Sequence, residues 1–216
     1  MYKNLYDTFA RWYHDNRGQV WLYSDPHFAD EEMKHLRKNY IGDEEQVRRI
    51  NSKVGKYDTL VILGDIGMKD WVRKLHGYHV LIMGNHDSGA TSYMRHNGYI
   101  DRLNHSPGEK YQYVEQDNGL FDEIYEGPLF ISPRIVLSHE PIDLPFAFNI
   151  HGHEHGTQTY KDDRHLNVCA EHIDYTPVCL KHVVDSGALK DIPTIHRIAI
   201  ENQKKNKKTS LKKSDT

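Results

Sequence analysis

Short apolar runs of strand length alternate with charged segments in the first half of the chain. The runs span residues 20–24, 58–63 and 78–83. Residues 29–56 are charged but carry spaced apolar side chains and a break near residues 40–42, which predicts two helices. A short helix is expected around Trp71. This alternation predicts parallel strands that are joined by right-handed crossovers.

The pattern changes after residue 120, where the apolar runs become shorter and lie closer together. Turn residues separate these runs, which is typical of hairpins and of mixed or antiparallel pairing. A final helix is expected over residues 181–188. The sequence therefore predicts a single domain over residues 1–200, of the α/β (α+β) class, with two packed sheets flanked by helices. The later strands are expected near residues 121–126, 129–131, 134–138, 146–150, 165–170 and 177–180.

The two ends and one central segment complete the predicted elements. Leu5, Phe9 and Trp12 recur at helical spacing and predict an amphipathic helix within residues 1–17. Another short helix is expected over residues 91–97. Residues 201–216 contain lysines without apolar periodicity, so they are expected to form a basic, disordered tail. Such a tail is either a solubilising end or a weak binder of polyanions.

Charge is spread unevenly between the predicted domain and its tail. The formal net charge is -3, and residues 201–216 hold six lysines against Glu201 and Asp215, a local charge of +4. Residues 1–200 therefore carry about -7. An acidic domain is not typical of a dedicated binder of duplex DNA, which would present a basic face. The sequence thus allows contact with nucleic acid but does not favour it.

No run of apolar residues approaches the roughly 20 that a membrane-spanning helix needs. The first residues lack the apolar core and the cleavage site of a secretory signal, so a cytoplasmic location is expected. Cys169 and Cys179 do not form a zinc-type pair, and we interpret both as buried hydrophobic residues rather than a disulfide. The sequence leaves the oligomeric state open.

Histidine is abundant, with 16 residues, and several histidines follow apolar runs. Neutral imidazole is the commonest metal-ligand side chain. Side chains at positions i and i+2 of an extended segment point the same way, so the pairs Asp25 with His27 and His153 with His155 can each converge on one ion. His151 is out of phase with the second pair and is left out. The runs end on Asp25 and His27, on Asp65, on Asn85, His86 and Asp87, on His139, and on His153 and His155.

Taken one at a time, most of these motifs have an ordinary structural explanation. Asp25 and His27 suit a surface loop, Asp65 follows a glycine as in many turns, and His139 stands alone. The Gly-Asn-His-Asp segment is more specific. Asn85 offers a neutral carbonyl oxygen as a ligand, His86 offers a proton near neutral pH, and Asp87 can orient the His86 imidazole. Together the set predicts an enzyme with a metal centre.

In their order along the chain, these blocks resemble the calcineurin-like metallophosphoesterase superfamily. The blocks Asp-x-His, Gly-Asp, Gly-Asn-His-Asp, His and Gly-His-x-His run from residue 25 to residue 155. Residues 167–171 and 175–178 look like the small bacterial and phage-type members of that superfamily. One departure is Ser88-Gly89, where many relatives carry an arginine. The candidates for a replacement cation, by elimination, are Arg95, Arg102 and Arg134.

The resemblance implies a calcineurin-like fold, a β-sandwich of two mixed sheets with helices outside. It also implies a centre of two divalent cations, with Mn²⁺ as the first choice and Fe, Zn²⁺ or Mg²⁺ as alternatives. His86 would face the substrate as a catalytic residue beside Asp87. In this assignment Asp25, His27 and His155 hold one metal, Asn85, His139 and His153 hold the other, and Asp65 bridges them.

The function expected from this resemblance is hydrolysis of a phosphodiester or phosphomonoester by a metal-activated hydroxide, with His86 assisting. The substrate is expected to be small or nucleotide-like. Two alternatives stay open. One is a nuclease acting on DNA or RNA, and the other is a metal-binding scaffold that uses the same fold to bind proteins.

Overall fold

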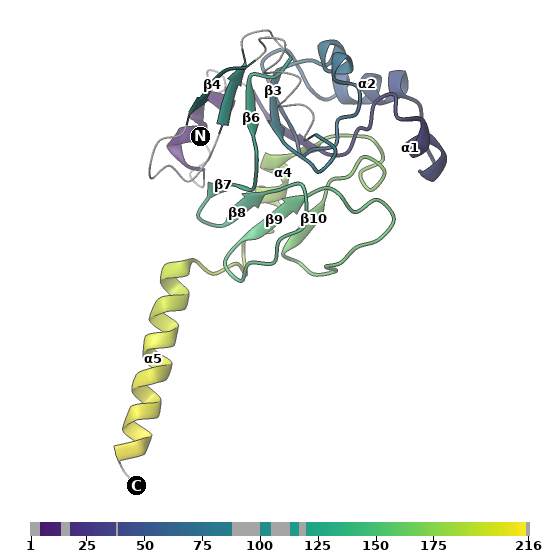
Figure 1. The fold of residues 1–216 in the computed structure, drawn as a ribbon. Coiled ribbons are helices and arrows are strands. Elements are labelled where there is room, and N and C mark those ends of the chain that lie inside the picture. Colours follow the sequence, from purple (N-terminus) through teal and green to yellow (C-terminus); the bar gives the residue numbers. More distant parts are fainter. Residues whose placement is uncertain are drawn as a thin grey trace.

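The computed structural model describes residues 5–13, 18–37, 39–87, 100–104, 113–116 and 120–214. Two β-sheets and several helices make up an α/β structure, which agrees with the fold class predicted from the sequence. Figure 1 shows the four-stranded sheet next to the seven-stranded sheet, with the last helix extending away from both.

The larger sheet contains seven strands in the order β11-β1-β2-β3-β6-β5-β4. Its centre is parallel, because β1 pairs with β2, β2 with β3 and β3 with β6 in the same direction. The pairs β11 with β1, β5 with β6 and β4 with β5 are antiparallel. The bounds are β1 Val20–Tyr23, β2 Thr59–Ile62, β3 Tyr78–Ile82, β4 Ile100–Asn104, β5 Tyr113–Gln116, β6 Glu123–Tyr125 and β11 Val178–Cys179.

The smaller sheet contains four strands in the order β10-β9-β8-β7. The strands β7 and β8 form an antiparallel hairpin, whereas β8, β9 and β10 pair in parallel. This confirms the mixed pairing that the second half of the sequence predicts. The bounds are β7 Leu129–Ser132, β8 Ile135–Leu137, β9 Phe148–His151 and β10 His165–Asn167.

Strand β2 shows why the first-half strands are continuously apolar rather than alternating. Its Val61 packs in a core that also contains Leu137 and Ile150 of the smaller sheet. Leu60 and Ile62 point to the opposite face and pack in a second core. A strand that is buried on both faces needs apolar residues at every position.

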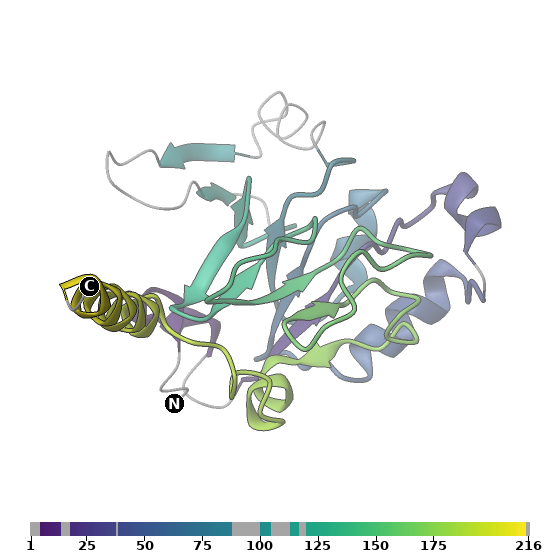
Figure 2. The ribbon, with the colours of Figure 1, turned by 90° about the horizontal axis from the view of Figure 1, so that it is seen from below.

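Helices cover the outer face of the larger sheet (Figures 1 and 2). The predicted break near residues 40–42 is confirmed, because Gly42 adopts a φ of 85° directly before α2. The Asp30 carboxylate caps α1 by accepting hydrogen bonds from two backbone amides. The bounds are η1 Asp7–Trp12, α1 Glu31–Leu36, α2 Asp43–Asn51, η3 Lys69–Lys74 and α4 Leu180–Asp185.

Two terminal predictions differ from the structure in detail. The amphipathic segment near the N-terminus is a short 3₁₀ helix whose Phe9 and Trp12 are buried, as their spacing predicts. The basic end, expected to be disordered, is instead helical in α5, Ile195–Ser214. Lysine, glutamine and glutamate are good helix formers, so a helix does not require apolar periodicity.

No described helix is both long and apolar enough to span a bilayer.

Within residues 91–120 the structure describes residues 100–104, 113–116 and 120. The helix expected over residues 91–97 lies outside the described residues. Strands β4 and β5 extend the larger sheet as an antiparallel pair. They lie at the edge of the sheet, away from β1 and β2.

Candidate metal centre

The predicted ligands meet where strands of both sheets end. Asp25 follows β1, Asp65 follows β2, His139 follows β8 and His153 follows β9. The carboxyl ends of neighbouring parallel strands lie at one edge of a sheet, so the loops that follow them converge there. Two groups result, each with ligand atoms within 4.8 Å of one another. They are Asp25, His27 and His155, and Asp65, His139 and His153.

The carboxylate of Asp25 is fixed by hydrogen bonds to only one of its oxygens. Its Oδ2 lies 2.5 Å from the Ser24 hydroxyl, 2.9 Å from the His153 amide and 3.0 Å from Cys169 Sγ. Its Oδ1 is buried, has no hydrogen-bond partner in the described structure, and lies 3.4 Å from His155 Nε2. Burial opposes ionisation, yet nearby His139 and the Ser24 hydroxyl lower the pKa of Asp25. An anionic oxygen is therefore left to bind a cation.

His27 presents a second buried atom without a hydrogen-bond partner in the described structure. Its Nδ1 lies 3.3 Å from Asp30 Oδ2, and its Nε2 lies 3.6 Å from Asp65 Oδ2. Burial and the charge of Arg37 lower the pKa of His27, which favours the neutral imidazole. A neutral ring with Nδ1–H directed at Asp30 keeps the lone pair of Nε2 available for a metal.

His155 is oriented by Glu171, a residue that the sequence reasoning did not assign to the site. His155 Nδ1 lies 2.6 Å from Glu171 Oε1. The other oxygen of Glu171 lies 3.7 Å from Arg37 Nε, and the buried Arg37 guanidinium also donates to the backbone carbonyls of Asp25 and Pro26. Although burial opposes it, the Glu171 hydrogen bond raises the pKa of His155. The motif containing Glu171 was noticed only as part of the family resemblance.

The second group gathers around His139. Its Nε2 lies 2.7 Å from Asn85 Oδ1, 3.1 Å from His153 Nδ1 and 3.4 Å from Asp65 Oδ2. Its Nδ1 lies 2.8 Å from the Leu63 carbonyl, so the proton belongs on Nδ1 and Nε2 carries the lone pair. Separations of this size suit donors that share one ion with bonds of about 2.1 Å.

Asp65 lies between the two groups. Its Oδ2 is 3.6 Å from His27 Nε2 and 3.4 Å from His139 Nε2. Its Oδ1 accepts a hydrogen bond of 2.9 Å from the His86 amide. One buried carboxylate oxygen thus faces imidazole nitrogens of both groups, which is the arrangement that a bridging ligand requires. Together with the two unpartnered atoms, this donor set fits a pair of divalent cations.

His86 and Asp87 have different surroundings from each other. The His86 side chain is exposed, and its ring centroid lies 5.6 Å from that of His27. The buried Asp87 carboxylate accepts hydrogen bonds from the amides of Asp65, Ile66 and Gly84. The expectation that Asp87 orients the His86 imidazole is therefore corrected, because in the described structure its hydrogen bonds hold the loops after β2 and β3 together. Burial raises the pKa of Asp87.

The backbone at the site is strained in a way that sequence reasoning could not foresee. Asp25, His27, Asp65 and His153 all adopt positive φ, with values of 55°, 46°, 53° and 69°. Left-handed conformations are uncommon for residues other than glycine and concentrate at functional sites. Gly152 is needed for close approach, since a Cβ there would lie 1.8 Å from Ser24 Oγ and 2.3 Å from Asp25 Oδ2.

Arg134 and His151, which were also considered from the sequence, make their contacts with residues outside the two ligand groups. Arg134 donates hydrogen bonds to the carbonyls of Leu189 and Ile192. The side chains of Arg95 and Arg102 are outside the described residues. His151 lies beside His165, with ring centroids 6.2 Å apart.

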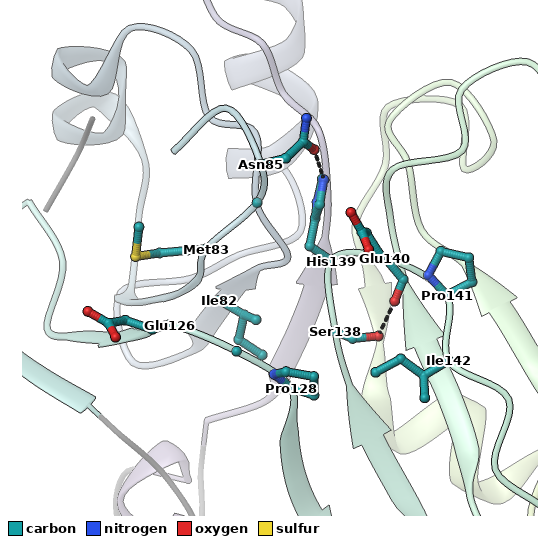
Figure 3. A pocket seen from close by; sticks show the side chains of 12 residues that line it. Ile82, Met83, Asn85, Glu126, Pro128, Ser138, His139, Glu140, Pro141 and Ile142 are labelled. Atoms are coloured by element: carbon teal, nitrogen blue, oxygen red, sulfur yellow. Dashed lines mark hydrogen bonds between the residues drawn. The ribbon is translucent and has the colours of Figure 1, made fainter. Parts of the chain in front are cut away.

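Two hollows flank the ligand groups. One, of about 260 Å³, reaches Asn85 and His139 and is shown in Figure 3. The other, of about 590 Å³, is lined by His153 and His155 among others. Both adjoin candidate metal ligands, and Glu140 lines both. A small molecule therefore has room to reach the ligand groups from two sides.

Comparisons with known proteins add information on the fold alone. No family model matches the sequence, and no curated protein matches it. The fold is similar to the crystal structure of a protein of unknown function, AQ665, from Aquifex aeolicus. The two share 22% sequence identity with a TM-score of 0.55, over 78% of this chain and 99% of that chain. The chain is thus an α/β protein whose architecture recurs in a protein of unknown function.

Proposed function

We propose that this protein is a phosphoesterase of the calcineurin-like metallophosphoesterase type that hydrolyses a small phosphodiester or phosphomonoester. The observation that carries the proposal is Asp65, whose Oδ2 faces His27 and His139 from two separate ligand groups. Sites that hold two cations about 3.5–4 Å apart are typical of enzymes that cleave phosphoesters. The two mixed sheets agree with the architecture of that superfamily but are not specific to it.

In the proposed centre, seven side chains would hold two cations, and Mn²⁺ is the expected metal because the ligand set mixes carboxylate, amide and imidazole groups. The bound cations would supply charge neutralisation of the phosphate and a water of lowered pKa. Asp25, His27 and His155 would hold one cation, Asn85, His139 and His153 would hold the other, and Asp65 would be available to both.

The protein's own residues then position the substrate and move a proton. His86 is exposed next to His27, so its ring can reach a phosphate that is bound over the centre. We expect it to stabilise negative charge on the phosphate or to protonate the leaving oxygen, a role typically worth 10²–10⁴-fold in rate. The Asp87 carboxylate keeps the loop that carries His86 in place through its bonds to Gly84 and Asp65.

The test measures hydrolysis of bis-p-nitrophenyl phosphate and p-nitrophenyl phosphate by metal-stripped protein, before and after adding Mn²⁺, Zn²⁺ or Mg²⁺. We expect Mn²⁺ to restore hydrolysis. Replacing His86 by Ala should leave two metals per chain, measured by elemental analysis, and lower kcat by about 10²-fold or more. The matched control is His35→Ala, since His35 is an exposed histidine on α1.

Two results would contradict the proposal. Full turnover by His86→Ala would remove the role assigned to that side chain. No hydrolysis of either ester by protein that binds two metals per chain would favour the metal-binding scaffold instead.

A further inference from the structure

Besides the candidate ligands His139 and Asn85, the 260 Å³ cleft is lined by side chains that the metal centre does not use (Figure 3). Met83, directly after β3, lies on one side of it, over the fully buried Ile82. Pro128 and Ile142 supply further apolar surface from the other chain segments that border it. A group that enters this cleft from the metal centre therefore meets alkyl surface.

One wall of the cleft is held by a buried hydrogen-bond network. Asn149 Oδ1 accepts a hydrogen bond of 2.8 Å from the Ile142 amide, and its Nδ2 donates to the Ser138 hydroxyl at 2.8 Å. That hydroxyl donates to the Glu140 carbonyl at 2.6 Å. Asn149 is completely buried, so residues 138–142 form a preorganised wall.

The charged side chains that line the cleft are two glutamates. Glu126 lies beside Met83, and Glu140 lies across the cleft beside His139 and Pro141 (Figure 3). Both glutamates are exposed and make no ion pair among the described residues. The described lining residues include no lysine or arginine. Two carboxylates around an alkyl surface favour an organic cation and repel a second anionic group.

We propose that the cleft binds one ester arm of the substrate and that this arm is a short alkyl chain bearing an ammonium group. The inference rests on the proposed phosphoesterase function and names the substrate class of the same site. In this arrangement the phosphate lies at the metal ligands, the methylene groups contact Met83, Pro128 and Ile142, and the ammonium lies between Glu126 and Glu140.

Two synthetic diesters of p-nitrophenyl phosphate distinguish the effect of the charge of the second ester arm from the effect of its shape. One carries a 2-(trimethylammonio)ethyl arm, and the other carries a 3,3-dimethylbutyl arm of nearly the same shape without the charge. In both reactions water adds to phosphorus, the bond to the aryl oxygen breaks, and p-nitrophenolate and a proton are released. We expect kcat/KM to be about tenfold higher for the cationic diester, mainly through a lower KM.

The double variant Glu126→Gln with Glu140→Gln should bring this ratio close to one while bis-p-nitrophenyl phosphate is still hydrolysed. The exposed Glu32→Gln, on α1, should keep the tenfold preference. Equal kcat/KM for the two diesters in the unmodified protein would overturn the inference.

A second readout does not depend on turnover. In metal-stripped protein labelled with ¹³C at the methionine methyl groups, the cationic diester should shift the Met83 resonance, and the neutral diester should shift it at least fivefold less at equal concentration. Equal shifts, or no shift of Met83 with either diester, would overturn the inference. If metal-loaded protein hydrolysed neither diester while the cationic diester still shifted Met83 selectively, the phosphoesterase function would be contradicted. The cation site would then be supported independently of that function.

Discussion

At the scale of single residues, the candidate metal centre contains buried atoms with hydrogen-bond partners and buried atoms without them. Asp25 Oδ2 is held by three contacts while Asp25 Oδ1 and His27 Nε2 remain buried without a hydrogen bond in the described structure. Burying an unpaired polar atom normally costs about 1–3 kcal/mol. A bound cation would remove that cost, so metal binding and stability are expected to be coupled.

Glu171 offers a test of how His155 is oriented. Replacing it by Gln keeps the size but removes the anionic acceptor 2.6 Å from His155 Nδ1. Loss of such a partner typically weakens metal affinity 10–100-fold, and we expect that range for one of the two bound Mn²⁺ ions, measured by calorimetric titration at pH 8. Glu201→Gln, an exposed change on α5, is the control and should leave both affinities unchanged.

The same variant has a pH signature that a merely destabilised site would not show. A protonated imidazole cannot bind metal, and the pKa of His155 is raised, so protons compete with the metal up to a higher pH than for an ordinary histidine. Metal binding should therefore weaken as pH falls through this raised pKa. In Glu171→Gln the pKa of His155 falls, and the midpoint of this loss should move to lower pH. An unchanged midpoint would contradict the assignment.

At the scale of elements, a buried carboxylate on β6 ties the N-terminal segment to the larger sheet. Glu123 accepts hydrogen bonds from side chains of η1, β3 and β6, and its side chain is buried. The sequence predicted the apolar contribution of η1 from the spacing of Phe9 and Trp12. The polar contribution depends on residues more than 100 positions apart, so local patterns do not contain it. The donors are Arg11, Trp12, Tyr78 and Tyr125.

Replacing Glu123 by Ala should lower the free energy of unfolding by about 1–3 kcal/mol, because it leaves the buried Trp12 indole N–H without its acceptor. Urea denaturation followed by tryptophan fluorescence measures the change. Glu126→Ala, three residues further along and exposed, is the matched control and should change the value by less than about 0.5 kcal/mol. Similar losses for both variants would contradict the network.

At the scale of the whole molecule, the centre joins the two sheets. Asp25 follows β1 of the larger sheet, and its Oδ2 accepts a hydrogen bond from the His153 amide, which follows β9 of the smaller sheet. Gly152 makes this approach possible, since any Cβ there would overlap Ser24 and Asp25. Gly156, in contrast, has no atom within 4 Å of the position of its Cβ.

Gly152→Ala should therefore disturb both the contact between the sheets and the metal centre. We expect it to lower the free energy of unfolding by about 2 kcal/mol or more and to reduce bound metal below two ions per chain. Gly156→Ala, in the same loop, should leave both quantities unchanged. Equal free energies of unfolding and equal metal content in the two variants would contradict this prediction. They would show that the sheets can move apart slightly without loss of stability.

Much of this protein is determined by its sequence alone. Apolar runs and helical spacing predicted the parallel strands, the helix break at Gly42 and the mixed second sheet, because burial imposes periodicity on local sequence. The ligand candidates were recognisable because strands deliver polar side chains at their ends. Tertiary structure alone decided their grouping, the position of Asp65 between the groups, the Asp87 bonds to backbone amides, and the partnership of Glu171 with His155. Those features depend on contacts between segments that are distant in sequence, and no local pattern encodes such distances.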